Sequence, residues 1–178
     1  MSIPYLVSMW QDTSSGYTLP YRLTAYTPTT LGTNTGATAT ITNPTYAYDS
    51  AGISTYAQIS THTASTAITT PSVQVIYTTV GYPGGTYTGH LYCNCTGTIS
   101  GGGAGGLLFI GYSLNGGSTF TWWIAQSNSS AWANQTFSAV LTNQDLSQVQ
   151  VFVYSYSADD GSLQVNCNVL VYDIYINT

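Results

Sequence analysis

Charged side chains are scarce in this sequence. Only 4% of its 178 residues are Asp, Glu, Lys or Arg, against about 25% in typical globular domains. Arg22 is the sole basic residue, glutamate is absent, and six aspartates bring the formal net charge to -5. Nucleic acids and anionic membrane surfaces bind clusters of Lys and Arg. We therefore expect neither nucleic acid nor a membrane as a partner.

Long hydrophobic runs are also missing. No stretch approaches the ~18 consecutive apolar residues of a membrane-spanning helix. The first eight residues, Met1-Ser-Ile-Pro-Tyr-Leu-Val-Ser, lack the basic segment and the long apolar segment of a signal peptide. The composition nevertheless resembles that of extracellular proteins. We expect a protein that is made in a host cytoplasm and works outside it, at the surface of a virion.

Cysteine and histidine are too few for common metal sites. The three cysteines are Cys93, Cys95 and Cys167, and the two histidines are His62 and His90. The Cys-Asn-Cys motif lacks the spacing of a structural zinc site. A disulfide between Cys167 and either Cys95 or Cys93 would leave one thiol over. The alternative is that all three are small, reduced core residues, as free cysteines often are.

Catalytic motifs are lacking as well. No serine has the flanking glycines of a nucleophile elbow. Asp159 and Asp160 are adjacent and precede a glycine, which is typical of a turn rather than of paired catalytic carboxylates. We expect a protein that is not an enzyme and that requires no cofactor.

Strand-forming residues, by contrast, are abundant. Thr, Val, Ile and Tyr dominate, and their branched or aromatic side chains pack well on a pleated surface. The clearest alternation places Val149, Val151 and Val153 on one face of a strand, and Val165, Val169 and Val171 on one face of another. We expect these six valines in one core. From Leu170 onward the apolar phase shifts, which indicates a bulge or a strand buried on both faces.

The spacing of strands and turns predicts an all-β fold, a single β-sandwich or jelly roll. Candidate strands fall near residues 3–8, 20–26, 36–42, 55–60, 72–80, 87–96, 106–113, 118–126, 135–141, 148–157 and 163–176. Glycine-containing turns follow Tyr82, Asn115 and Asp159, and a glycine-rich loop begins at Gly101. Residues 1–35 have shorter runs and three prolines. We interpret them as an N-terminal arm or lead-in strands, and residues 36–178 as the sandwich.

Several residues are candidates for binding. Trp122 and Trp123 are adjacent, so one faces in and the other faces out, where it could stack on a sugar or contact a neighbour. Trp132 lies in the Ser- and Asn-rich segment 127–135, which we interpret as a loop suited to ligand contact. Trp123, Trp132 and Tyr112 are the candidate ligand-binding residues. Asp49 could bind calcium with backbone carbonyls of its loop, or it could hold the loop as an Asx-turn.

Three stretches resemble one family in the expected order. Ala47-Tyr-Asp-Ser-Ala-Gly-Ile-Ser-Thr-Tyr-Ala, Gly111-Tyr-Ser-Leu-Asn-Gly-Gly-Ser-Thr-Phe-Thr and Leu170-Val-Tyr-Asp-Ile-Tyr-Ile resemble segments of discoidin-type, galactose-binding-like jelly rolls. The resemblance covers residues 37–177 and implies that fold. Ser50 stands where the family pattern has Gly, and Tyr56 stands where it has Trp. Degenerate jelly rolls of this kind also occur in phage and other viral surface proteins.

Two classes of function follow. Because a neutral surface rich in Tyr and Thr is desolvated cheaply, we expect a virion structural or surface protein, such as a capsid decoration or fibre protein. Its partners would be copies of itself and other virion proteins. The alternative is a carbohydrate-binding module or adhesin domain that binds neutral glycans.

Overall fold

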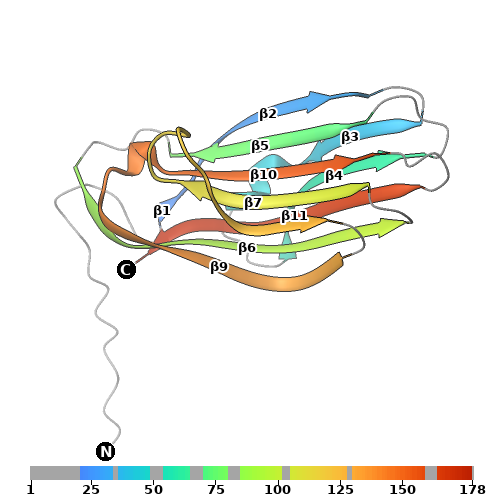
Figure 1. Ribbon diagram of the computed structural model, residues 1–178. Coiled ribbons are helices and arrows are strands. Elements are labelled where there is room, and N and C mark those ends of the chain that lie inside the picture. The colour runs from blue at the N-terminus through green and yellow to red at the C-terminus, as the bar shows by residue number, and fades with distance from the viewer. Residues whose placement is uncertain are drawn as a thin grey trace, which may run out of the picture.

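The fold is a β-sandwich of two antiparallel sheets. The computed structural model describes residues 21–33, 36–48, 54–64, 70–79, 85–101, 105–127, 130–158 and 164–177. Figure 1 shows the two sheets packed face to face. Among the described residues, two short 3-10 helices, η1 (Pro44–Tyr48) and η3 (Leu146–Gln148), connect strands. No helix in the described ranges is long and apolar enough to cross a membrane.

Each sheet has a continuous strand order. The six-stranded sheet runs β3 (Ala37–Thr42), β4 (Ala57–Thr63), β11 (Val165–Asn177), β6 (Tyr87–Gly101), β9 (Ser130–Gln144), with β1 (Tyr21–Arg22) paired to β11. The five-stranded sheet runs β2 (Ala25–Leu31), β5 (Ser72–Thr78), β10 (Gln150–Ser157), β7 (Gly106–Ser113), β8 (Thr121–Ser127). Strands β4 to β11 therefore form the orders β4-β11-β6-β9 and β5-β10-β7-β8. This connectivity is that of a jelly roll, which confirms the predicted fold class.

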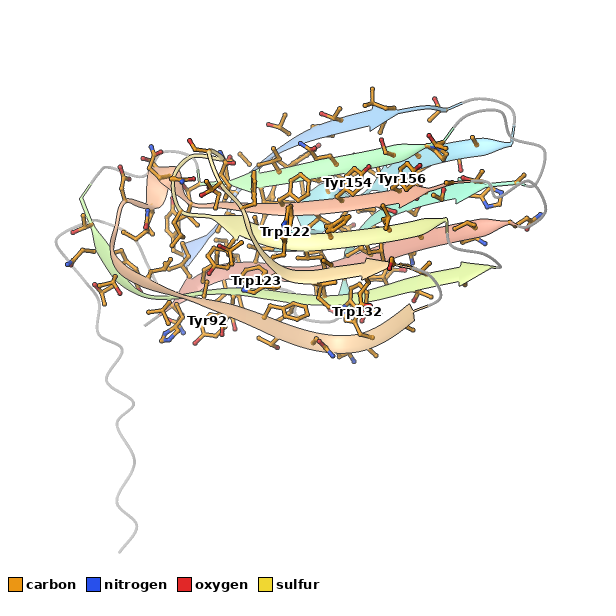
Figure 2. The ribbon with its side chains drawn as sticks, in the orientation of Figure 1. Tyr92, Trp122, Trp123, Trp132, Tyr154 and Tyr156 are labelled. Carbon is orange, nitrogen blue, oxygen red and sulfur yellow. The ribbon has the colours of Figure 1, made fainter. Side chains whose placement is uncertain are left out.

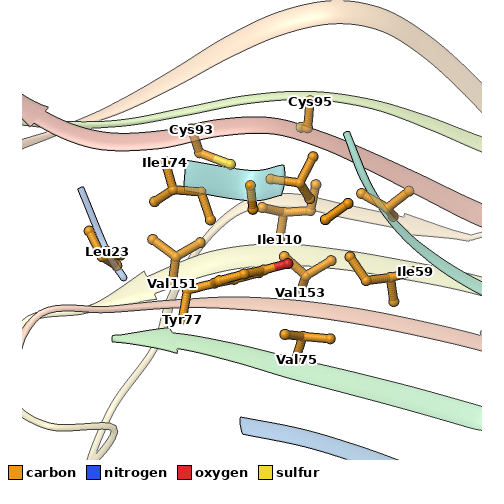
Figure 3. Packing of buried hydrophobic residues seen from close by; sticks show 14 of the residues in the cluster. Leu23, Ile59, Val75, Tyr77, Cys93, Cys95, Ile110, Val151, Val153 and Ile174 are labelled. Atoms are coloured by element: carbon orange, nitrogen blue, oxygen red, sulfur yellow. The ribbon is translucent and has the colours of Figure 1, made fainter. Parts of the chain in front are cut away.

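The core lies between the two sheets. All six predicted core valines are buried, and they join one continuous cluster with residues of both sheets. In Figure 3, Val151 and Val153 lie beside the ring of Tyr77, and Ile174 and Cys93 approach from the opposite sheet. The hydroxyl of Tyr77 is buried and has no hydrogen-bond partner among the described residues. The alternation that predicted the inward faces is thus confirmed on the strands where it was strongest.

The predicted phase change near Leu170 is a bulge. The pairing of β11 with β6 shifts register between Val171 and Asp173. At this point the side chain of Asp173 turns to Arg22, whose Nε and Nη2 donate to the two carboxylate oxygens at 3.2 and 3.1 Å. The only basic residue of the chain therefore fastens β1 onto β11.

The described part of the predicted arm lies within the sandwich. Residues 21–22 pair with β11, and residues 25–31 pair with β5 at the edge of the five-stranded sheet. Tyr21 and Leu23 are buried in the core cluster. A division of the chain after residue 35 therefore cuts across both sheets. Residues 1–20 lie outside the described residues, so an arm there stays a prediction.

The turn predicted at Asn115 is present between β7 and β8. Gly116 and Gly117 have φ values of +68° and +88°, which glycine adopts without steric cost. The backbone N–H of Gly117 donates to Ser113 Oγ at 2.9 Å. The turns predicted after Tyr82 and Asp159 fall largely outside the described residues.

Candidate functional site

The two outer faces of the sandwich differ in chemistry. Much of the face of the six-stranded sheet is polar, with hydrogen bonds between Thr40 Oγ1 and Ser60 Oγ at 2.7 Å and between His62 Nδ1 and Asn166 Oδ1 at 2.7 Å. It also carries one stacked aromatic pair, Tyr92 and Tyr175. The face of the five-stranded sheet carries a larger, connected group of aromatic rings over β7, β8 and β10. An apolar surface left on one side of a sheet is a common mark of a binding site.

We define the aromatic face as six residues of β7, β8, β10 and the residue before β8. They are Phe109, Phe120, Trp122, Phe152, Tyr154 and Tyr156. Figure 2 shows Trp122, Tyr154 and Tyr156 on this sheet.

The rings of the aromatic face form one connected group. Phe152 is the centre, with ring centroids 5.1 Å from Phe120, 5.3 Å from Trp122 and 6.1 Å from Tyr154. Tyr156 extends the row at 6.5 Å from Tyr154, with the two rings only 12° from parallel. Such spacings are typical of interacting aromatic pairs. The result is a continuous apolar surface that follows β10.

Alternation along β10 produces this row. Val151 and Val153 point into the core, so Phe152, Tyr154 and Tyr156 point outward. The valines were recognised in the sequence as an inward face, but the aromatic residues between them were missed as a binding surface. Their alternation with the valines was the signal that could have identified it.

A bulge in the β7–β8 pair decides the orientation of the two tryptophans. The register shifts between Ile110 and Gly111, so that Ile124 opposes Ile110 while Trp122 opposes Gly111. Trp123 is the extra residue of the bulge. Trp122 faces out and is 46% exposed. A Cβ at position 111 would lie 2.6 Å from the indole of Trp122, so glycine allows that ring to lie close to the sheet.

The aromatic face carries no formal charge in the described part of the chain. The charged residues described are Arg22 and Asp173, which pair on the other sheet, and Asp145, which caps η3. Polar groups border the aromatic rings instead. In the β10–β5 pair, Gln74 stands opposite Tyr154 and Ser72 opposite Tyr156. Burial raises the pKa of Tyr154, and a hydrogen bond with Ser72 offsets part of that rise, so the phenol is neutral at physiological pH.

Trp123 and Tyr112, two of the predicted binding residues, lie on the inner side. Both are partly buried against the core cluster, with ring centroids 4.9 Å apart. Trp123 also stacks on Phe137 of β9 at 6.1 Å, and its Nε1 donates to the carbonyl of Ser138 at 2.9 Å. These contacts link β8 to β9, which are edge strands of the two sheets. The expectation that one adjacent tryptophan faces out is confirmed, but the outward one is Trp122 rather than Trp123.

Trp132 lies in a strand rather than in a loop. It belongs to β9 and is only 8% exposed. Its ring lies against Gly97 of β6, where a Cβ would collide with it. The loop interpretation of 127–135 was wrong for residues 130–135, because pairing with β6 outweighs the weak strand propensity of Ser and Asn. A ligand cannot reach this indole without displacing core packing.

The three cysteines are free and buried. Cys95 pairs with Val171, whereas Cys167 pairs with Ile99. Four residues of strand separate these positions, which is about 13 Å at 3.3 Å per residue. A disulfide needs Cα atoms within about 7 Å, so Cys95 and Cys167 form no bridge. The alternative of three reduced core residues is confirmed.

No site for a metal emerges from the described residues. They contain no group of three or more His, Cys, Asp or Glu side chains that could hold an ion. Asp49, the predicted calcium ligand, lies outside the described residues, so that role stays a prediction.

Comparisons with known proteins give distant structural matches only. No protein-family model and no curated protein matches the chain. Among solved structures, "TmCBM61 in complex with beta-1,4-galactotriose" matches with a TM-score of 0.36 and 9% identity over 88% of this chain and 90% of that chain.

Two further matches come from Clostridium perfringens. The family 32 carbohydrate-binding module of NanJ in complex with galactose has a TM-score of 0.33 and 9% identity, over 88% of this chain and 96% of that one. CpGH89 in complex with GlcNAc-alpha-1,4-galactose has a TM-score of 0.34 and 15% identity, and the match spans 88% of this chain but 14% of that protein. Likeness at this level does not define a ligand for this chain.

Proposed function

We propose that this chain is a non-catalytic binding domain that holds neutral glycans on its aromatic face. The observation that carries the proposal is the connected row of six rings on one outer sheet face, with Trp122 the most open of them. The rings are held in register by β10 and by the β7–β8 bulge, so the surface is formed before any ligand arrives. A preformed apolar surface with a few polar groups beside it is typical of ligand sites.

The chemistry of a sugar ring matches this surface. A pyranose has a face of C–H groups and a rim of hydroxyls. The C–H face gains hydrophobic and dispersion energy when it packs on an aromatic ring. Hydroxyls at the rim can exchange hydrogen bonds with Gln74, Ser72 and the phenol groups of Tyr154 and Tyr156. Because the described side chains of this face include no cation, a uronate or sulfate group would lose hydration without gaining a partner.

A role in a virion assembly stays a prediction. Jelly rolls occur both in viral capsid proteins and in lectins, so the fold favours neither function. The aromatic face could instead pack against a second copy of the chain, since interfaces are also enriched in Tyr and Trp. The size of the protein in solution separates these two uses of the same surface.

Affinity electrophoresis on a panel of neutral and acidic polysaccharides tests the proposal. We expect retardation by at least one neutral polysaccharide, and a loss of about tenfold in affinity, or about 1.4 kcal/mol, in Trp122→Ala and Tyr154→Ala. The matched control is Tyr92→Ala, which removes an aromatic ring from the opposite sheet face, where Tyr92 stacks on Tyr175 at 5.0 Å. This variant should bind as the unchanged protein does.

Three outcomes would contradict the proposal. One is no retardation by any neutral polysaccharide, and another is an equal loss in Tyr92→Ala. The third is a dimer or larger assembly that Trp122→Ala converts to monomers without any effect of sugar, which would assign the aromatic face to assembly.

A further inference from the structure

A small pocket lies at the end of the six-stranded sheet, where β3 ends and β4 begins. Its volume is about 260 Å³, and the described residues that line it are Thr42, Asn43, Tyr46, Ser54, Thr55, Tyr56 and Gln58. The volumes of pockets for drug-sized molecules begin near 300 Å³, so this pocket suits a ligand of one small ring. It lies on strands of the other sheet from the aromatic face, as the positions of β3 and β4 in Figure 1 show.

A tight backbone turn forms one wall of this pocket. Asn43 follows β3 with a φ of +49°, in the left-handed region that Asn tolerates better than most residues. Its carbonyl accepts a hydrogen bond from the backbone N–H of Tyr46 at 3.0 Å, which begins η1. Ala47 is fully buried and anchors η1 in the core. Tyr46, its neighbour, stays 39% exposed at the pocket.

Tyr56 is the second aromatic residue of the pocket, after Tyr46. Its ring packs edge-on against Tyr172 of β11, with centroids 6.1 Å apart and an angle of 83° between the planes. It remains 40% exposed. Two partly open phenol rings thus border one pocket: Tyr46 belongs to η1, and Tyr56 directly precedes β4. Between them lie hydroxyl and amide side chains of Thr42, Asn43 and Gln58.

The lining specifies a ligand class. Every lining side chain that the structure describes is a hydroxyl, an amide or a phenol, and none of these carries a formal charge. Amides and hydroxyls both donate and accept hydrogen bonds, and aromatic rings pack on C–H surfaces. The matching ligand is small, uncharged and rich in hydroxyl groups, with one apolar ring face.

We propose that this pocket binds a single neutral pyranose unit, either a free monosaccharide or the end of a glycan chain. This site is separate from the aromatic face and does not depend on it. The aromatic face would hold the length of a chain across β7, β8 and β10, whereas the pocket would hold one unit between η1 and the start of β4.

The test is a titration of the full, isotope-labelled chain followed by amide NMR. The probes are methyl glucopyranoside, methyl galactopyranoside and N-acetylglucosamine, with glucuronate as the charged comparison. We expect saturable shifts at Asn43, Tyr46, Tyr56 and Gln58 with at least one neutral sugar, and weaker binding of glucuronate. Tyr46→Ala and Tyr56→Ala should each raise the dissociation constant about tenfold or more.

Matched controls separate this site from the aromatic face and from misfolding. Tyr92→Ala should leave monosaccharide binding unchanged, and in Trp122→Ala the pocket amides should shift as they do in the unchanged protein, because that ring lies on the other sheet. The amide spectrum of each variant shows whether the sandwich is intact. Absence of saturable shifts at the highest soluble sugar concentration overturns the pocket proposal, and so do shifts that survive in Tyr46→Ala and Tyr56→Ala or preferential binding of glucuronate.

Discussion

At the scale of single residues, the hydroxyl of Tyr77 is an unusual feature of the core. It is buried without a hydrogen-bond partner among the described residues, and an unsatisfied buried polar group costs about 1–3 kcal/mol. We therefore predict that Tyr77→Phe raises the free energy of unfolding by about 1 kcal/mol, measured by urea denaturation. Tyr77→Ala is the comparison, and it should lose about 3–5 kcal/mol by leaving a cavity. A clear loss of stability in Tyr77→Phe would show that the hydroxyl has a partner.

The buried thiols predict a response to alkaline pH. Burial raises the pKa of Cys167 to about 11 from an ordinary value of 9.0. A hydrogen bond with Cys95, followed by burial, raises the pKa of Cys93. A thiol whose folded pKa is raised contributes stability that is complete below the unfolded pKa and is lost as pH rises toward the folded value.

The free energy of unfolding should accordingly fall between about pH 9 and pH 11, and less steeply in Cys167→Ala than in the unchanged protein. Chemical denaturation at a series of pH values measures both slopes. Since neutral buried thiols are inert, a thiol reagent at pH 8 should label the denatured chain but not the native one. Equal slopes, or rapid labelling of the native protein, would contradict the packing of these cysteines.

At the scale of elements, β1 and β2 decide what a truncation does. A chain that begins at residue 36 loses Tyr21 and Leu23 from the core, and it loses Arg22 from its pair with Asp173, whose side chain is only 10% exposed in the intact fold. Removing one partner of a largely buried pair is strongly destabilising. We predict that this truncation lowers the unfolding temperature sharply or abolishes folding, whereas a chain that begins at residue 21 stays folded. Thermal unfolding followed by circular dichroism compares the two, and equal unfolding temperatures would contradict the placement of β1 and β2.

Local pattern predicted some elements well and others poorly. β10 and β11 were predictable because valines alternate along them and both are central strands buried on the inner face. β2 was predicted only in part, since Pro28 interrupts its pattern, and proline is tolerated there because β2 is an edge strand. The pairing of β10 with both β5 and β7, and of β11 with both β4 and β6, joins residues far apart in the chain. No local pattern encodes those partners.

The sequence predicted that a tryptophan would lie on the outer surface, but it did not identify which residues form the candidate site. An outward tryptophan at positions 122–123 was expected, and the structure has one. The choice between Trp122 and Trp123 depends on the bulge opposite Gly111, which arises only when β7 and β8 pair. Trp132 resembled a loop residue because its neighbours are Ser, Ala and Asn, and its burial follows from the partner strand β6.

At the scale of the whole molecule, the sandwich has two neutral outer faces of different character. The described charges are placed for structure: Arg22 and Asp173 fasten β1, and Asp145 caps η3. One face offers mainly hydroxyls and amides together with the Tyr92–Tyr175 pair, and the other offers the connected aromatic face bordered by Gln74 and Ser72. This arrangement suits contact with neutral polar partners, and a homo-oligomeric state stays a prediction that sedimentation or light scattering can test.

The indole N–H signals of the four tryptophans test the central claim most directly. They can be assigned by single Trp→Phe variants and followed by NMR as a retained neutral oligosaccharide is added. We predict that the signal of Trp122 shifts saturably, while those of Trp123, bonded to the carbonyl of Ser138, and of Trp132, buried against β6, stay in place. Shifts at Trp123 or Trp132 with none at Trp122 would contradict the assignment of the aromatic face as the binding surface.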